Sequence, residues 1–213
     1  MATRKVVTRS GRRVRGVFPS AKNQRMVAWE SLLERDAIVL FELSPGVIAY
    51  EEQPSIELYY EDSAPRKYYP DFALTLSDGT VAHVEVKPQK KLAKKDVAQR
   101  FNLIASSYQR QSRQFWILTE EEIRRQPRLT NLSRCAYHLK ARTSGKPTSW
   151  QLLELRRRDD WTFEHLAAAL KEPHAVYRLL ALGLASCDFD KPIQSSTSIT
   201  FPPSGGKNDS LYF

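Results

Sequence analysis

Cysteine and long apolar runs are both scarce in this sequence. Its 213 residues include two cysteines, Cys135 and Cys187, which lack the close spacing of a metal site. This excludes a disulfide scaffold and favours a reducing compartment. No apolar run reaches the roughly 18 to 20 residues that span a bilayer, and the basic N-terminus has no apolar signal segment. We therefore expect a soluble, cytoplasmic protein with no membrane partner.

Acidic residues are in deficit, above all near the N-terminus. The chain has 33 Lys and Arg against 24 Asp and Glu, a net charge of +9, and its first acidic residue is Glu30. Such a charge favours a polyanionic partner. We predict that residues 1–25 form a basic arm that contacts DNA phosphates, although a solvated tail would have the same composition. The predicted DNA-binding residues of this arm are Arg12, Arg13, Arg15 and Lys22.

A hairpin is predicted in the segment KYYPDFALTLSDGTVAHVEVKP, residues 67–88. Apolar and polar residues alternate over 72–76 and again over 81–87, which is the period of a half-buried strand. Between them, residues 77–80 (SDGT) are typical of a turn. Antiparallel pairing through this turn brings the start of the first strand, at Asp71, close to the end of the second, at Glu85 and Lys87.

These three polar residues have two interpretations. A solvated surface hairpin would explain them, because an aspartate followed by Glu-x-Lys arises often by chance. However, the residues around Glu85 and Lys87 are apolar and β-branched, as in an inner strand, where unpaired charges are costly. A catalytic role explains charges in such a strand better.

A helix is predicted from about Met26 to Leu43, and it could supply a further carboxylate. Glu30 and Glu34 are one turn apart and would share a face. Carboxylates together with a lysine suit metal-assisted phosphodiester hydrolysis, with Mg²⁺ as the cofactor and Mn²⁺ as its substitute. Asp71, Glu85 and the carbonyl of Val86 would form half of the ion's shell, and the lysine would stabilise the reacting phosphate.

These residues resemble the PD-(D/E)xK nuclease superfamily and, more narrowly, TnsA, the endonuclease subunit of heteromeric TnsA/TnsB transposases. The similarity runs from about Phe18 to Pro88 and rests on FPSAKNQRMVAWESLLERD, EEQPSIELYY and YYPDFALTLSDGTVAHVEVKP, in that order. It implies an α/β fold, a restriction-endonuclease-like mixed sheet flanked by helices. It also implies that Glu34, Asp71, Glu85 and Lys87 are catalytic, with Glu34 also a metal ligand, and that Gln53 lies near the site. Glu30 is a further candidate to support the site from the same predicted helix face, although an exposed helical glutamate is usually just solvated.

The resemblance further implies a function in DNA transposition. The expected reaction is magnesium-dependent cleavage of the 5′ strands at transposon ends, so that the element is excised. The expected partners are double-stranded transposon-end DNA, a DDE-type transposase subunit and an AAA+ ATPase regulator, in the bacterial cytoplasm. Two alternatives stay open: a stand-alone restriction-type or junction-cutting nuclease, and a non-catalytic DNA-binding scaffold that keeps the fold.

A second group of basic residues directly follows the hairpin. We name it the lysine cluster: Lys90, Lys91, Lys94 and Lys95. An amphipathic helix follows, with apolar residues at 97, 101, 104 and 108. Such a run is usually a solvated face, but its position beside the proposed site favours phosphate contacts. A buried strand is predicted at residues 115–118, and Thr119 with Glu122 predicts a capping box.

A second, smaller domain is predicted after residue 145. The segment KARTSGKPTS, residues 140–149, reads as a linker. Three helices and a hairpin that pairs residues 184–187 with 195–200 would give a small winged-helix-like domain. We thus divide the chain into an arm (1–25), an endonuclease domain (26–145), a partner-docking winged-helix-like domain (146–200) and a flexible tail (201–213).

Overall fold

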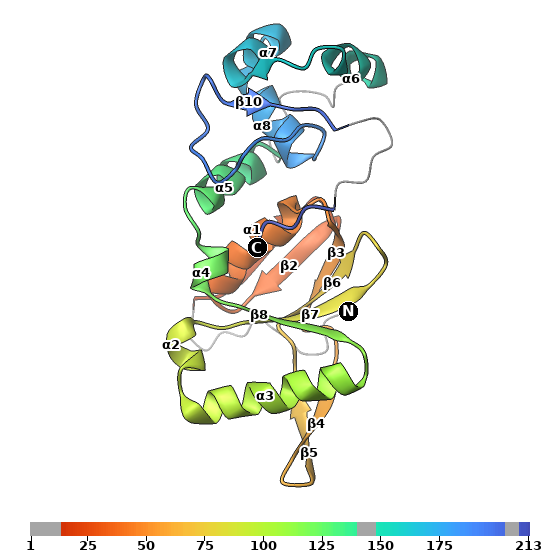
Figure 1. Ribbon diagram of the computed structural model, residues 1–213, viewed down its shortest axis with the longest axis vertical. Helices are drawn as coiled ribbons and strands as arrows, with labels where there is room; N and C mark the ends of the chain where they lie inside the picture. Colours follow the sequence, from red (N-terminus) through yellow and green to blue (C-terminus); the bar gives the residue numbers. More distant parts are fainter. Residues whose placement is uncertain (1–13, 140–147, 203–208) are drawn as a thin grey trace.

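The core of the protein is a mixed four-stranded sheet. We analysed a computed structural model that describes residues 14–139, 148–202 and 209–213. The strands β3 (Val47–Glu52), β6 (Phe72–Leu76), β7 (Val81–Val86) and β8 (Gln114–Leu118) lie in the order β3-β6-β7-β8 (Figure 1). The first two pairings are antiparallel and the last is parallel. A mixed α/β sheet flanked by helices fits the predicted restriction-endonuclease-like fold.

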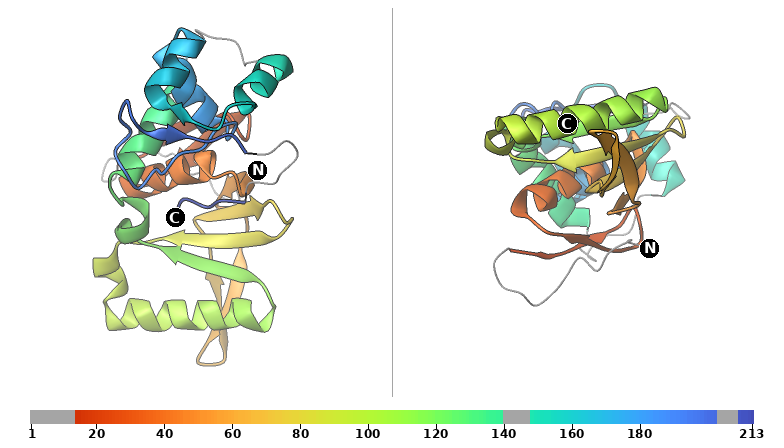
Figure 2. Two further views of the ribbon diagram at one scale, coloured as in Figure 1. Left: turned by 45° about the horizontal axis from the view of Figure 1, so that its top comes forward. Right: turned by 90° about the horizontal axis from the view of Figure 1, so that it is seen from below.

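Two helices cover opposite faces of this sheet, as the right-hand view of Figure 2 shows. Helix α1 (Leu32–Leu43) packs on the face that buries Phe72, Leu74 and Val84. Helix α3 (Lys95–Arg110) covers β7 and β8 from the other side, where Tyr68 and Phe115 pack against it. The alternation along β6 and β7 thus turns apolar residues toward α1, while Ala73, Thr75, His83 and Glu85 take the opposite face, as the sequence predicts.

The elements around the predicted hairpin agree with the sequence. β6 and β7 pair antiparallel with Phe72 opposite Val84, and the strand expected at 115–118 is β8. The short helix α2 (Gln89–Leu92) and α3 connect β7 to the parallel β8. Thr119 forms the predicted capping box with Glu122 and opens α4 (Glu120–Ile123).

Two further hairpins flank the sheet. One pairs β1 (Gly16–Ser20) with β2 (Arg25–Trp29), and the other pairs β4 (Glu57–Glu61) with β5 (Ala64–Tyr68). The first hairpin corrects two predictions: residues 16–25 are not an extended arm, and the helix does not begin near Met26. It begins at Leu32 because Ser31 is its N-cap, whose side chain accepts a hydrogen bond from the Glu34 backbone.

A helical unit follows the sheet. It contains α5 (Arg128–Leu139), α6 (Ser149–Arg156), α7 (Phe163–Leu170) and α8 (Pro173–Ala181), with α5 packed on both α1 and α8. The three helices expected after the linker are present. The expected pairing of residues 184–187 with 195–200 is present only as one antiparallel bridge, between Ser186 and Thr200. The rest of the second segment, β10 (Ser198–Ile199), pairs instead with β9 (Trp161–Thr162), the strand before α7.

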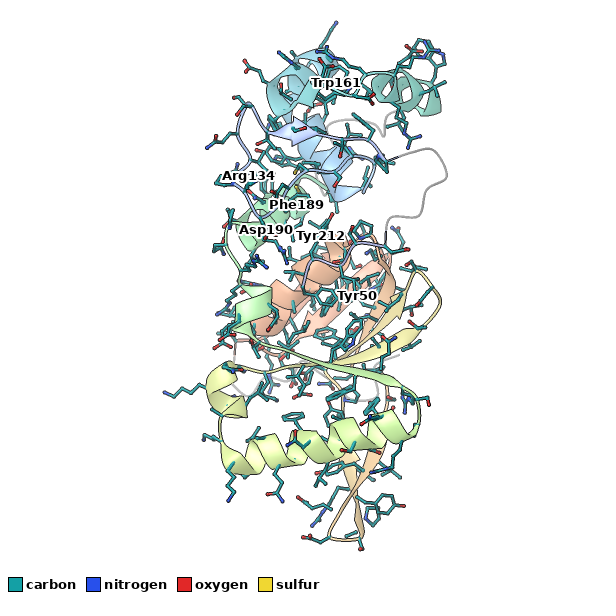
Figure 3. All side chains as sticks on the ribbon, viewed as in Figure 1. Tyr50, Arg134, Trp161, Phe189, Asp190 and Tyr212 are labelled. Carbon is teal, nitrogen blue, oxygen red and sulfur yellow. The ribbon has the colours of Figure 1, made fainter. Side chains whose placement is uncertain are left out.

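The end of the chain returns to the sheet, so the prediction of a wholly flexible tail is wrong for residues 209–213. The Phe213 ring packs on Phe41 of α1, with 5.4 Å between ring centroids. Tyr212 packs edge-on against Phe189 of the helical unit, as Figure 3 lets the reader follow. The tail thus contacts the sheet layer and the helical unit at once. Within the described residues, no helix is both long and apolar enough to cross a membrane.

Candidate active site

A cavity of about 490 Å³ lies where β6 begins and β7 ends. The geometry expected from the hairpin therefore holds, because the two strand ends meet at one edge of the sheet. The first turn of α1 closes the cavity from one side, and α2 and α4 flank it. Its polar lining residues are Glu30, Ser31, Glu34, Asp71, Lys87, Lys91 and Arg124, and Val86 also lines it.

Asp71 stands at the entrance to β6 and is held by backbone groups. Its Oδ2 accepts a hydrogen bond of 2.8 Å from the Val86 N–H, across the hairpin. The backbone carbonyl of Asp71 accepts a hydrogen bond of 2.9 Å from the Gln53 N–H, and Gln53 has the unusual φ of 44°. Burial, followed by the charges of Glu85 and Glu34, raises the pKa of Asp71 well above its usual range. Gln53 therefore lies beside the site, as predicted, through its backbone.

Glu34 reaches the cavity from the first turn of α1. Its carboxylate accepts hydrogen bonds from the Glu30 N–H at 2.7 Å and the Ser31 hydroxyl at 2.9 Å. Burial is the main cause of its raised pKa, and the charges of Glu30 and Glu85 add to it. Glu30 also lines the cavity, but it precedes the helix, so the expectation that both glutamates share a helical face is wrong.

Glu85 and Lys87 form an ion pair beside the cavity. Lys87 Nζ lies 2.5 Å from Glu85 Oε1, and the other carboxylate oxygen of Glu85 accepts a hydrogen bond of 2.7 Å from the Tyr68 hydroxyl. Glu85 is only 3% exposed, and the cavity is lined by Lys87 but not by Glu85. Burial opposes the charge of Lys87, but Glu85 and Asp71 outweigh it and raise its pKa. The role of Glu85 as a metal ligand stays a prediction.

The donors around the cavity fit a hard divalent cation. Mg²⁺ is usually held by one or two carboxylates, waters and substrate phosphate, and Asp71 and Glu34 line the cavity together. The Val86 N–H points at Asp71, and the N–H and C=O of one strand residue face the same side, so its carbonyl does too. Among the described residues, no three His, Cys, Asp or Glu side chains are already gathered to hold an ion. A half-shell completed by water and phosphate fits better than a closed protein cage.

The predicted DNA contact at Lys22 is wrong. Its ammonium donates hydrogen bonds to three backbone carbonyls, those of Phe41 in the last turn of α1, the C-cap Ser44 and Val47 of β3, at 2.9, 2.8 and 2.5 Å. Burial lowers its pKa to about 8, although the charge of Glu42 opposes this. Lys22 therefore caps a helix C-terminus. Arg15 is half-buried just before β1, and Arg12 and Arg13 lie outside the described residues.

The lysine cluster lies beside the cavity. Lys90 and Lys91 belong to α2, Lys94 is the N-cap of α3, and Lys95 is its first residue. All four side chains are exposed, and that of Lys91 lines the cavity. Their contact with DNA stays a prediction, which this placement favours because phosphates bound at the site would lie within reach of a lysine.

Two residues of the site were missed by sequence reasoning. Tyr68 is separated from Glu85 by 17 positions and lies on β5, which pairs with β4 and not with β7. Only the packing of this hairpin against the sheet brings its hydroxyl to that carboxylate. Arg124 lines the cavity from the end of α4, and its Nε donates 2.8 Å to the buried carboxylate of Asp36. The Tyr68-Tyr69-Pro70-Asp71 run points to Tyr68 in retrospect. No local pattern marks Arg124, because its partner lies 88 positions away.

A scan against protein families matches residues 44–120 to the family described as "TnsA-like endonuclease N terminal". The matched segment runs from the end of α1 to the start of α4, and it includes Asp71, Glu85, Lys87 and the lysine cluster. Glu34 lies before it. A search of curated proteins finds no match to this chain.

Proposed function

We propose that this chain, which carries a TnsA-like endonuclease N-terminal domain, is the metal-dependent DNA endonuclease subunit of a transposase. It cleaves the 5′ strands at transposon ends so that the element is excised, and a DDE-type transposase subunit cuts and joins the 3′ ends. The observation that supports this proposal most strongly is the convergence of Glu34, Asp71 and Lys87 on one cavity, next to a family match that names an endonuclease.

In this proposal Asp71, Glu34 and the Val86 carbonyl hold Mg²⁺, or Mn²⁺ in its place. The bound ion supplies a Lewis acid for attack on the phosphodiester. The raised pKa values of Asp71 and Glu34 are those expected of carboxylates that are close together and partly withdrawn from water. A neighbouring cation would stabilise the ionised form of such carboxylates. Lys87 faces the same cavity, where its ammonium holds the attacking water or stabilises the charge that develops on the phosphate.

The surroundings of the cavity suit a DNA strand. The lysine cluster offers four exposed ammonium groups on one flank, which would bind phosphates without reading bases. On another flank, Asp36 holds Arg124 through Nε, and no described residue accepts a hydrogen bond from the terminal guanidinium nitrogens. A planar guanidinium fixed in this way can bind a phosphate with two parallel hydrogen bonds.

We place the contacts with the transposase and an AAA+ ATPase in the winged-helix-like C-terminal part of the chain. Trp150 and Leu153 of α6 are exposed there, at 69% and 49%, and exposed apolar side chains of this size favour protein contacts.

Strand-resolved cleavage of a transposon-end DNA tests the proposal. The DNA is labelled separately on each strand and incubated with Mg²⁺, with the chain alone and with the partner transposase. We expect cleavage of the strand that carries the 5′ end of the element, at each transposon end. Cleavage of unrelated duplexes without the partner would indicate a stand-alone nuclease, and no cleavage under any condition would indicate a non-catalytic scaffold.

A further inference from the structure

The structure points to a further residue of the site: we propose that the Tyr68 hydroxyl is a positioning group that fixes Glu85 as the counter-ion of Lys87. This inference rests on the proposed function and names how its lysine is held. Tyr68 donates 2.7 Å to Glu85 Oε2, while Lys87 Nζ lies 2.5 Å from Oε1. Both carboxylate oxygens thus have a partner, and three side chains form one chain of contacts that ends in the cavity.

Tyr68 itself has little freedom to move. It is 3% exposed, and its ring meets the rings of Phe101 and Phe115 edge-on, at 6.3 and 5.9 Å between centroids. These contacts come from α3 and β8, on the far side of the sheet from α1. The hydroxyl is therefore carried by a rigid aromatic layer, which lets it hold the carboxylate in one orientation.

Glu85 passes this restraint on to Lys87. A lysine has four rotatable bonds and a compact charge, so its position depends on its partner. Among the residues that the structure describes, Lys87 has one carboxylate in direct contact, that of Glu85, and its ammonium also lies 5.6 Å from the centroid of the Phe101 ring. If the Tyr68 hydroxyl is removed, Glu85 can turn, and Lys87 turns with it. Tyr68 therefore acts on the reaction through Lys87 and not by touching the substrate.

The chain offers a matched control for the same substitution. Tyr108 lies in the same aromatic layer, is also 3% exposed, and stacks on Phe115 at 4.9 Å between centroids. Within the described part of the chain its buried hydroxyl has no hydrogen-bond partner. Tyr68→Phe and Tyr108→Phe thus remove the same atom from the same layer, and only Tyr68→Phe breaks a contact with Glu85.

The test compares both variants with wild type in single-turnover cleavage over a range of Mn²⁺ concentrations. At saturating Mn²⁺, we expect the cleavage rate of Tyr68→Phe to fall by about tenfold to a hundredfold. This is the effect of losing one hydrogen bond to a charged group when the whole loss raises the barrier to cleavage. We expect the half-saturating Mn²⁺ concentration to change by less than about threefold, and Tyr108→Phe to cleave like wild type. A Tyr68→Phe rate that recovers fully at high Mn²⁺ would assign the hydroxyl to metal binding, and equal losses in both variants would assign it to packing; either overturns the proposal.

A second measurement needs neither metal nor DNA, so it separates this inference from the proposed function. Lys87 is labelled with an amine-reactive reagent, and its modification rate is followed by mass spectrometry. We expect Tyr68→Phe to raise the labelling rate of Lys87 severalfold and Tyr108→Phe to leave it unchanged. If wild type does not cleave DNA but Tyr68→Phe still releases Lys87, the proposed function fails and the positioning contact stands. An unchanged labelling rate in Tyr68→Phe overturns the contact itself.

Discussion

Lys87→Met separates the catalytic role of the lysine from its role in stability. The substitution keeps an unbranched side chain against Phe101 and removes the ammonium. Loss of one positioned electrostatic group typically lowers the rate by about a hundredfold to a thousandfold. The substitution also leaves Glu85, which is only 3% exposed, without its cation. We therefore expect 5′-strand cleavage to fall by that factor and the fold to be destabilised at the same time.

The size of the stability loss follows from the exposure of the pair. Removing one partner of a fully buried ion pair costs about 3 to 5 kcal/mol. Lys87 is 28% exposed, so water reaches the pair, and we expect a smaller loss of about 1 to 3 kcal/mol. The Tyr68 hydroxyl still solvates Glu85 in the variant, which also limits the cost. Thermal or urea unfolding of the metal-free protein measures this loss.

A double variant decides whether lost cleavage reflects chemistry or unfolding. Lys87→Met/Glu85→Gln removes the unpaired charge and keeps an oxygen that can accept from Tyr68. We expect it to regain most of the stability that Lys87→Met loses, while its cleavage stays at least a hundredfold below wild type. Both proteins are assayed on strand-labelled DNA at a temperature well below their unfolding transitions. Recovery of cleavage along with stability would refute the catalytic role of Lys87.

Three further predictions test the site and the tail. Asp71→Asn should abolish cleavage yet stabilise the metal-free fold. The raised pKa of Asp71 makes the wild-type protein lose about 1.4 kcal/mol of stability for each pH unit between 3.8 and that pKa, and asparagine removes this loss. Urea unfolding from pH 4 to 8 measures the free energy of unfolding of both proteins, and the same pH dependence in both would contradict the prediction. Neutralising the lysine cluster should reduce the slope of log affinity against log salt by up to about one unit per lost phosphate contact; an unchanged slope in DNA-binding titrations would place the cluster in solvent. Gly46→Ala should displace the tail, because its Cβ would meet the Asp209 carbonyl oxygen at 2.4 Å; its melting temperature should match that of a chain lacking residues 209–213, and a wild-type value would show that the tail adapts.

The proximity of Asp71 and Lys87 could be predicted from the sequence because it depends on local patterns. The alternation of apolar residues fixed which face each strand residue takes, and the SDGT turn fixed antiparallel pairing. These two facts are enough to bring Asp71 to Lys87. Such rules could not predict the partner of the second carboxylate oxygen of Glu85. That oxygen accepts a hydrogen bond from Tyr68, and this contact depends on how the β4–β5 hairpin packs against the sheet.

The errors arose where a tertiary contact outweighed local pattern. Lys22 lies among basic residues, which suggested a phosphate contact, but three carbonyls between 19 and 25 positions away hold its ammonium. The segment from Arg25 to Trp29 continues without a Pro or Gly into the α1 sequence, so the pattern favoured one long helix. The β1–β2 hairpin turns instead through Gln24, with a φ of 54°, a conformation for which Gly is the usual signal.

The charges of the site are divided between one partly buried ion pair, Lys87 with Glu85, and the carboxylates that line the cavity. The charges of Glu85 and Glu34 add to the raised pKa of Asp71, and the charges of Glu30 and Glu85 add to that of Glu34. Carboxylates gathered in this way would repel a DNA phosphate if they faced it alone. Lys87 neutralises Glu85 inside the protein, and Asp71 and Glu34 are left at the cavity, where a divalent cation would neutralise them. The lysine cluster stands outside this group on exposed helix ends, where, in the proposed function, it would attract phosphates without pairing with Asp71 or Glu34. Because Glu85 has its own cation, the cavity can present two carboxylates to a metal ion and an ammonium to the phosphate at the same time.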